Sequence, residues 1–208
     1  MREFDYDTDG FTIFRGLMPD DVIDKYVDFL HATFFDLGKR SRDEDYRRFE
    51  EIRDFLCHPV IEEKRKELGL DAGIEANLLN WSYEAVGWHA DRWGNDDRQF
   101  GIFYSLDVLP PESGRFAIYP GSHNWDIEKR MCRPGRGGGT GEYLSEVLSQ
   151  IDDKPYVFDG RKGDVLFWNG ECIHRRLEKE NDEPRKAAVV LCSDRGHVQH
   201  KDGFWYCV

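Results

Sequence analysis

Apolar positions in the first 70 residues follow a short strand pattern and then a helical one. Residues 10–14 form an apolar run typical of a strand. Pro19 and the acids after it favour a helix start, because proline is tolerated in the first turn and acids favour the positive end of the helix dipole. Apolar side chains recur with the helical period after Pro19 and again over residues 42–56, and Pro59 begins a third segment that ends near Gly69. The pattern predicts helices that bury one face.

From residue 74 the apolar positions follow strand spacing instead. Gly, Pro, Asn and Asp separate short runs of β-forming residues. The predicted strands are 75–83, 100–109, 115–119, 155–158, 164–168 and 186–193. Many short strands after a helical block predict a sandwich or jelly roll of two sheets with helices on one face. Ligands are then expected in the mouth between the sheets.

Composition narrows the class of partner. At 208 residues the chain fits one domain with a sizeable core. Its formal net charge of −12 disfavours nucleic acid and anionic membranes, because phosphate groups require a basic surface. No apolar run approaches the roughly 20 residues of a membrane span, and the acidic first residues do not resemble a secretory signal. Five cysteines without C-x-x-C spacing disfavour a disulfide framework or a zinc ribbon. The expected location is the reducing cytoplasm, and the oligomeric state stays open.

The candidate chemistry begins at His89-Ala90-Asp91. His174 lies 83 residues after Asp91, and Arg185 lies 11 residues after His174. Two imidazoles and one carboxylate on one face of a metal form the facial triad of non-haem Fe(II) oxygenases, which leaves positions open for O₂ and a chelating cosubstrate. The planar fork of an arginine suits a dicarboxylate such as 2-oxoglutarate. The spacing predicts an oxygenase that depends on Fe(II), 2-oxoglutarate and O₂, although an H-x-D triplet alone also fits a surface turn with a solvated Asp.

Motifs around the triad carry a family resemblance. Residues 9–16 form an opening strand, Pro120-Gly121-Ser122-His123 closes an apolar run, and Gly163-Asp164 leads into the segment that ends at His174. In chain order, these motifs and the triad resemble the phytanoyl-CoA dioxygenase family over about residues 9–194. The resemblance implies an α+β, mainly β fold: a double-stranded β-helix (jelly-roll, cupin-like) with N-terminal helices packed on one sheet.

The resemblance also implies a domain plan and a reaction. A single domain is expected over residues 1–208, with a helical block over about 18–70, a jelly-roll core over about 74–194 and a candidate lid loop over about 124–154. The glycine-rich segment 133–141 fits this lid or a flexible surface loop, since the Walker pattern is absent. The implied reaction is hydroxylation of a small molecule, coupled to conversion of 2-oxoglutarate to succinate and CO₂.

By the same resemblance, residues receive roles in the site. His89, Asp91 and His174 are the implied catalytic metal ligands, and Arg185 is the implied partner of the distal carboxylate of 2-oxoglutarate. Weaker cosubstrate candidates are Asn77, Phe103 or Tyr104, and Arg176. Position 187 is Ala where some relatives carry Ser, so one auxiliary hydrogen bond is missing or comes from elsewhere. If His174 points inward, strand alternation directs Arg175 outward and Arg176 inward, toward the cosubstrate or an anionic group of the substrate.

The substrate pocket is expected to have aromatic walls and a few arginines. Such a lining suits an anionic or amphipathic small molecule, although each aromatic also fits a place in the core. The candidates are Trp81, Tyr83, Trp88, Arg92, Trp93 and Trp168. The pattern does not choose the substrate within the family.

Further expectations concern residues near the triad and the competing classes of function. His123 is expected to tie down its turn, and Cys172 to be an ordinary buried cysteine without a partner for a zinc site. Asp91 fills the position that a halide would need, so hydroxylation or desaturation is expected instead of halogenation. Two alternatives stay open: a cupin-like metalloenzyme that does not use 2-oxoglutarate, and a non-catalytic jelly-roll binding module. Succinate release tests the first alternative, and metal binding tests the second.

Overall fold

Two antiparallel sheets form the centre of the structure. The computed structural model of the protein describes residues 2–33, 49–70, 73–75, 86–91, 98–125, 148–149, 151–181, 185–193 and 204–205. The larger, seven-stranded sheet has the order β1 (Arg2–Glu3), β2 (Phe11–Phe14), β8 (Val165–Asn169), β5 (Arg98–Ser105), β10 (Ala187–Ser193), β3 (Gly73–Glu75) and β11 (Phe204–Trp205). The smaller, four-stranded sheet has the order β4 (Val86–His89), β9 (His174–Arg176), β6 (Phe116–Ile118) and β7 (Tyr156–Val157).

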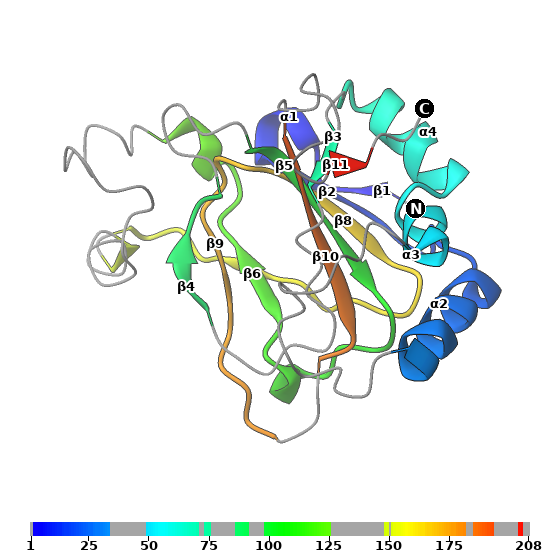
Figure 1. Cartoon of the computed structure of the whole chain (residues 1–208). Coiled ribbons are helices and arrows are strands. Elements are labelled where there is room, and N and C mark those ends of the chain that lie inside the picture. The colour runs from blue at the N-terminus through cyan, green and yellow to red at the C-terminus, as the bar shows by residue number, and fades with distance from the viewer. Residues whose placement is uncertain are drawn as a thin grey trace.

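Helices cover the outer face of the larger sheet. The longer ones are α2 (Asp20–Thr33), α3 (Glu50–Leu56) and α4 (Pro59–Glu67), and they lie on the opposite side of that sheet from β4, β6 and β9 (Figure 1). Pro59 is the first residue of α4, where its missing N–H leaves no intrahelical bond unmade. A short helix α1 (Tyr6–Asp9) precedes β2, with Asp5 capping its N-terminus and Gly10 ending it at a positive φ of 76°.

Side-chain alternation along the strands creates two cores. Alternate side chains along β5, β8 and β10, which we call one parity of the strand, face the helices. Tyr104, Phe167 and Val190 belong to this set and cluster with α2, α3 and α4. The other parity faces the smaller sheet, as Phe103 and Leu166 do in a second cluster with residues of β6. The interior between the sheets is therefore lined by alternate residues of every strand that faces it.

A buried aspartate ties the N-terminal strand to the sheet. Asp164 lies just before β8 and accepts hydrogen bonds from Arg15 Nη1 at 2.8 Å, Gly16 N at 2.8 Å and Arg161 N at 3.0 Å. Arg15 also pairs with Glu3 at 2.9 Å. The predicted Gly-Asp motif thus has a structural role at the junction of β2 and β8.

Each predicted helix and strand has a counterpart in the described ranges, but β5 ends at Ser105, before the predicted end at residue 109. The fold matches the predicted jelly roll with N-terminal helices on one sheet. Sequence periodicity missed β4 and β9, which contain only 4 and 3 residues. Most of the predicted strand 75–83 and most of the candidate lid loop lie outside the described residues.

Two further observations concern the environment of the protein. None of the helices in the described ranges is long and apolar enough to cross a membrane. Cys172 and Cys192 are buried and lie outside any disulfide, whereas Cys57 is disulfide-bonded. Disulfides are uncommon in reducing compartments, so the cytoplasmic location stays a prediction.

Candidate functional site

Antiparallel pairing of two short strands brings the predicted triad together. His89 on β4 lies directly opposite His174 on β9. Directly opposed residues of an antiparallel pair have neighbouring side chains, and the two imidazole ring centroids are 4.3 Å apart. Asp91 follows His89 by two residues, so it returns to the same side as that histidine. The cross-strand register therefore joins ligands that are far apart in the sequence.

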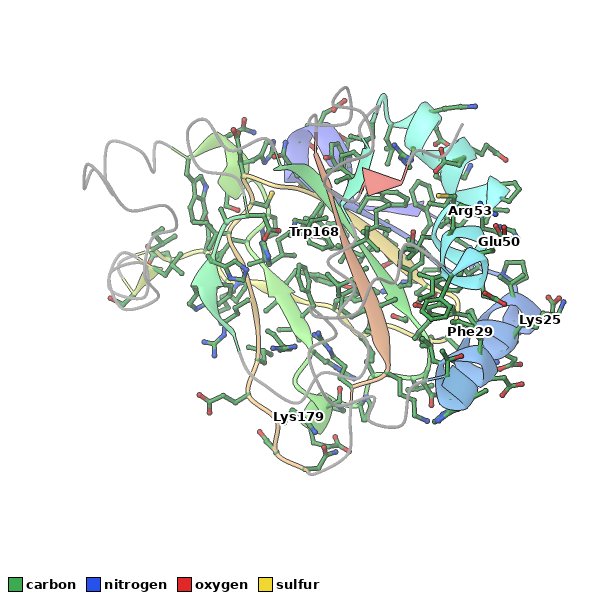
Figure 2. All side chains as sticks on the ribbon, viewed as in Figure 1. Lys25, Phe29, Glu50, Arg53, Trp168 and Lys179 are labelled. Atoms are coloured by element: carbon green, nitrogen blue, oxygen red, sulfur yellow. The ribbon has the colours of Figure 1, made fainter. Side chains whose placement is uncertain are left out.

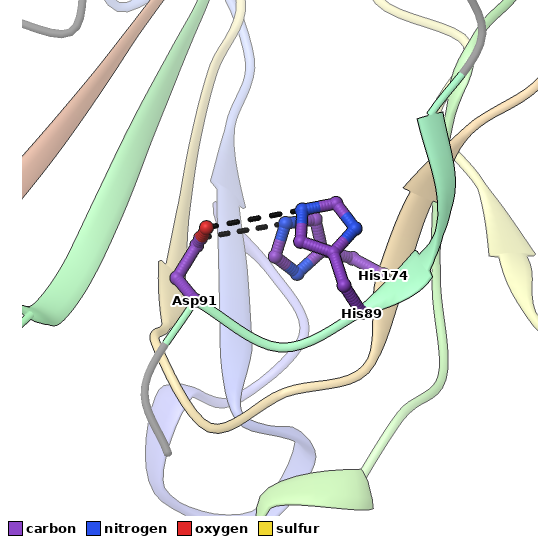
Figure 3. A group of neighbouring side chains, drawn as sticks. All are labelled: His89, Asp91 and His174. Atoms are coloured by element: carbon purple, nitrogen blue, oxygen red, sulfur yellow. Dashed lines mark ion pairs between the residues drawn. The ribbon is translucent and has the colours of Figure 1, made fainter. Parts of the chain in front are cut away.

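The three side chains form a compact cluster of metal-binding atoms. Asp91 Oδ2 lies 3.4 Å from His174 Nε2, and Asp91 Oδ1 lies 3.8 Å from His89 Nε2 (Figure 3). One ligand atom from each residue lies within 4.8 Å of the others. The side chains of Asp91 and His174 are 8% and 5% exposed, whereas that of His89 is 30% exposed. The cluster is therefore accessible mainly from the side of His89.

Hydrogen bonds to main-chain carbonyls orient both imidazoles. His89 Nδ1 lies 2.8 Å from Gly87 O, and His174 Nδ1 lies 3.0 Å from Cys172 O. A carbonyl can only accept, so each Nδ1 carries a proton, and in a neutral imidazole Nε2 is then the nitrogen available to a metal. Burial lowers the pKa of His174 to about 4, against the opposing effect of Asp91 and with a smaller lowering effect from the neighbouring His89. His174 is therefore neutral at physiological pH and able to bind a metal.

Trp168 contacts the carboxylate of the triad. Its indole Nε1 donates a hydrogen bond to Asp91 Oδ2 at 3.0 Å, and the side chain is buried in the middle of the molecule (Figure 2). The predicted role was a wall of the substrate pocket. The structure instead places Trp168 beside a ligand, because its position on β8 faces the interior. Residue type alone did not signal this hydrogen bond.

Arg185 lies in the interior between the sheets. It has the same parity as Ala187 and Leu191, which face the inner core, and it is 3% exposed. Its guanidinium lies over the Phe103 ring at 5.1 Å, and Nη1 donates a long hydrogen bond of 3.4 Å to Gly114 O. Among the residues that the structure describes, Nε has no hydrogen-bond partner. Burial lowers the pKa of Arg185 to about 9, and the charge of Arg176 adds to this effect.

Arg176 follows His174 by two residues on β9. Arg176 and His174 are buried, and Arg175 between them is only partly buried. This pattern confirms the predicted alternation of inward and outward side chains along the strand. Arg175 lies over the Trp88 ring at 5.4 Å on the outer side. Arg176 therefore adds a second buried positive charge close to Arg185.

A chain of aromatic contacts links the arginine to the metal-binding cluster. The Phe103 and Phe116 ring centroids are 5.7 Å apart, and Phe116 stacks on His174 at 5.1 Å. These rings line the interior between Arg185 and His174 with apolar surface. Charges placed there are poorly screened by water, so an anion bound at Arg185 would interact strongly.

Two predicted residues do not reach the site. Tyr104 faces the helices, where its hydroxyl donates to Leu56 O at 3.0 Å, because it has the opposite parity to Phe103. Of the two alternatives on this strand, only Phe103 faces the interior. Trp88 lies on the outer face of the smaller sheet, packed against Tyr119, since it has the opposite parity to His89. The remaining predicted residues lie outside the described part of the chain: Asn77, Trp81, Tyr83, Arg92 and Trp93.

The P-G-S-H turn has a structural role. Ser122 Oγ donates to Tyr119 O at 2.7 Å and accepts from Ile173 N at 2.9 Å, while His123 Nε2 lies 3.1 Å from Asp7 O. His123 is not part of the metal-binding cluster. Burial raises the pKa of the Cys172 thiol to about 12, which suits an inert cysteine.

Comparison with known proteins identifies the family. Residues 6–187 match the family model described as Phytanoyl-CoA dioxygenase (PhyH). The chain therefore belongs to the phytanoyl-CoA dioxygenase family.

Two curated relatives match part of the chain. Phytanoyl-CoA dioxygenase domain-containing protein 1 of Mus musculus is 23% identical over 109 residues, which cover 52% of this chain and 38% of the relative. The protein of the same name from Danio rerio is 30% identical over 92 residues, which cover 42% of this chain and 31% of the relative. The matched segments thus span about a third of the length of these relatives.

Solved structures share the fold at low sequence identity. The non-haem α-ketoglutarate-dependent carbocyclase SnoK superposes with a TM-score of 0.67 at 16% identity, covering 91% of this chain and 81% of SnoK. HygX from Streptomyces hygroscopicus, solved with nickel and 2-oxoglutarate, superposes with a TM-score of 0.62 at 14% identity, covering 90% and 83% of the two chains. The epimerase SnoN, solved with Fe³⁺ and α-ketoglutarate, gives 0.60 at 17% identity, covering 91% and 80%. These likenesses confirm the predicted double-stranded β-helix.

Proposed function

We propose that this protein is an Fe(II)- and 2-oxoglutarate-dependent oxygenase that hydroxylates a small-molecule substrate, with release of succinate and CO₂. The observation that carries the proposal is the cluster of His89, Asp91 and His174, whose ligand atoms lie within 4.8 Å of one another. Membership of the phytanoyl-CoA dioxygenase family supports the choice of metal and cosubstrate.

The donor set fits a ferrous ion. Two neutral imidazoles and a carboxylate are ligands that suit Fe(II), and three protein ligands leave positions for other molecules. Donors about 2.1 Å from a metal lie about 3 Å apart when they are at right angles. Asp91 has one carboxylate oxygen 3.4 Å from His174 Nε2 and the other 3.8 Å from His89 Nε2, so the three side chains need only a small rearrangement to place one donor atom each around an ion. When bound, iron with 2-oxoglutarate and O₂ would supply the oxidising chemistry.

The buried guanidinium of Arg185 fits the distal carboxylate of 2-oxoglutarate. Within the described ranges no acidic side chain pairs with Arg185, and its Nε has no hydrogen-bond partner. A buried cation without a counterion is costly, and a carboxylate bound by two hydrogen bonds would offset that cost. Ala187, two residues along the same face, adds no side-chain hydrogen bond.

Arg176 is proposed as a second anion contact. It is buried on the same strand face as His174, and its charge is felt at Arg185. Two neighbouring guanidinium groups disfavour each other unless an anion lies close to both. Arg176 would therefore strengthen the hold on the cosubstrate carboxylate, or hold an anionic group of the substrate. Either role fits an anionic or amphipathic small molecule.

The ordered environment of the triad would also govern access to the metal. Phe116 stacks on one face of His174 and Trp168 approaches it at 5.4 Å, so the inner side of this imidazole is closed by rings. His89 is the more exposed ligand. Substrate would therefore approach from the side of His89, while apolar rings exclude water from the side of His174.

A substrate-dependent succinate assay tests the proposal. The protein is loaded with Fe(II) without oxygen, mixed with 2-oxoglutarate and single metabolites, and exposed to air. We expect succinate release above background with a metabolite that gains one oxygen atom by mass spectrometry, and none from a His174→Ala variant. Metal-dependent turnover without succinate would instead favour the cupin-like metalloenzyme. Failure to bind Fe(II) or Mn(II) would favour the binding module.

A further inference from the structure

The hydrogen bond from Trp168 to Asp91 gives the triad a partner that no ligand motif includes. We propose that Trp168 is a positioning residue: its indole N–H holds Asp91 Oδ2, so that Oδ1 is presented to the metal. This inference rests on the proposed function, because it assumes that the triad binds a metal. It goes beyond that function by assigning different roles to the two oxygens of one carboxylate.

The two oxygens of Asp91 have different surroundings. Oδ2 accepts the hydrogen bond from Trp168 Nε1 at 3.0 Å in a buried environment. Oδ1 accepts no hydrogen bond from the residues that the structure describes, and lies 3.8 Å from His89 Nε2. An indole N–H is a donor only, so Trp168 cannot itself bind a metal. One lone pair of Oδ2 is therefore taken by the indole N–H, although Oδ2 also lies 3.4 Å from His174 Nε2, whereas both lone pairs of Oδ1 are available to a metal.

Packing fixes the indole in this position. Trp168 is 1% exposed, and its ring centroid lies 5.2 Å from that of Phe116 and 5.4 Å from that of His174. On the neighbouring strand β5, Gly101 is paired with Trp168. A Cβ built at Gly101 would lie 2.0–2.3 Å from the indole atoms, so only glycine lets the ring lie against this strand. The donor is thus held rigidly before any metal binds.

A rigid donor suits a carboxylate ligand for two reasons. It reduces the number of orientations that Asp91 loses on metal binding, and it stabilises the negative charge that remains on Oδ2. Partners of this kind tune metal sites, and their loss commonly weakens metal binding about 10- to 100-fold.

The test is a Trp168→Phe variant, which keeps an aromatic ring and removes the donor. Trp88→Phe is the matched control, because Trp88 is adjacent to the ligand His89 but lies on the outer face of the smaller sheet. Co(II) alone is titrated into each protein without oxygen, by calorimetry and visible absorption. We expect Trp168→Phe to bind Co(II) about 10- to 100-fold more weakly, with an altered d–d spectrum, and Trp88→Phe to match the wild type.

The outcomes separate this inference from the proposed function. If the wild type does not bind Co(II), the triad assignment itself fails. If the wild type binds Co(II) and folded Trp168→Phe binds it within twofold with the same spectrum, only the role of Trp168 is overturned.

A measurement on the wild type covers the case in which Trp168→Phe does not fold. The Trp168 indole N–H is assigned in a ¹⁵N spectrum through its contacts with Phe116, and Zn(II) is added. We expect slow exchange with solvent and a chemical shift that changes with Zn(II) saturation. An indole signal that exchanges as fast as an exposed one, or that ignores bound Zn(II), would contradict the proposal.

Discussion

Replacing Arg185 by methionine is expected to stabilise the ligand-free protein and to remove its affinity for 2-oxoglutarate. Arg185 is 3% exposed and has no acidic partner within the described ranges. Its buried charge therefore lowers the stability of the folded protein until an anion binds. Methionine has a similar length, fills irregular apolar space and carries no charge. Stability and ligand binding should therefore change in opposite directions at this position.

The magnitude follows from the burial of the charge. Burial and the neighbouring Arg176 lower the pKa of Arg185 to about 9, which corresponds to about 4–5 kcal/mol at roughly 1.4 kcal/mol per pKa unit. Methionine loses the contact with the Phe103 ring, worth about 2 kcal/mol, and a long hydrogen bond worth about 1 kcal/mol or less. The net gain is about 1–3 kcal/mol, or a rise in Tm of roughly 2–12 °C for a chain of this size.

Two measurements check this prediction. Thermal unfolding of the ligand-free protein reports stability, and calorimetric titration of 2-oxoglutarate into Mn(II)-loaded protein reports affinity. Loss of a buried charge pair costs about 2 kcal/mol or more, so the affinity should fall about 30-fold or more. Lys186→Met is the control, because Lys186 is adjacent, carries the same charge and forms only a partly exposed ion pair with Asp107 at 3.1 Å. It should leave both quantities close to wild type.

Two results would refute the reasoning about Arg185. Affinity within threefold of wild type in folded Arg185→Met protein would remove this arginine from the cosubstrate site. A lower Tm together with lost affinity would show that the guanidinium is well stabilised without ligand, so that its burial carries no net penalty.

Further predictions concern residues around the site. His174→Ala should lose bound Fe(II) with little change in Tm, whereas His123→Ala should keep the metal and lower Tm by roughly 2–4 °C for the loss of about 1 kcal/mol. Analysis of the metal content of both variants tests this prediction. A folded His123→Ala protein without iron would contradict it. Tyr104→Phe should cost about 1–3 kcal/mol in urea unfolding, because its buried hydroxyl bond is lost, and leave 2-oxoglutarate affinity unchanged; a weaker affinity would contradict its placement toward the helices. The Cys172 thiol, with a pKa raised to about 12 by burial, should resist iodoacetamide at pH 8 until the protein is unfolded, as mass spectrometry of the peptide would show.

The metal ligands could be predicted from the sequence because their chemistry is restrictive. Few residue types bind iron, and the order of His89, Asp91, His174 and Arg185 fits one known arrangement. The larger strands could be predicted because they are buried on both faces and bounded by turn residues. β9 is the polar run His174–Arg176 and β4 contains a glycine, so neither has a run of β-forming apolar residues, and the elements that hold the ligands were among those that the pattern missed.

The contact of Trp168 with Asp91 could not be predicted from the sequence. It joins residues 77 positions apart and depends on the register that pairs Trp168 with Gly101. The choice between Phe103 and Tyr104 likewise depends on which sheet face the helices cover. The orientation of Trp88, in contrast, could have been predicted from the sequence. Once His89 is assigned to the inner face, strand alternation places the neighbouring Trp88 on the outer face. Consistent use of strand parity would have excluded Trp88 from the pocket.

The same strands support stability with one parity and ligand binding with the other. On the helix side, Tyr104 has its hydroxyl bonded to a main-chain carbonyl, so its polar group is satisfied within the protein. On the inner side, Asp91 Oδ1 accepts no hydrogen bond from the described residues, and Arg185 Nε is buried without a hydrogen-bond partner among them. A buried polar group that is satisfied adds to stability, whereas one left open lowers it until a ligand completes it. Binding of a metal at Asp91 and of an anion at Arg185 is therefore expected to stabilise the folded protein through its inner face.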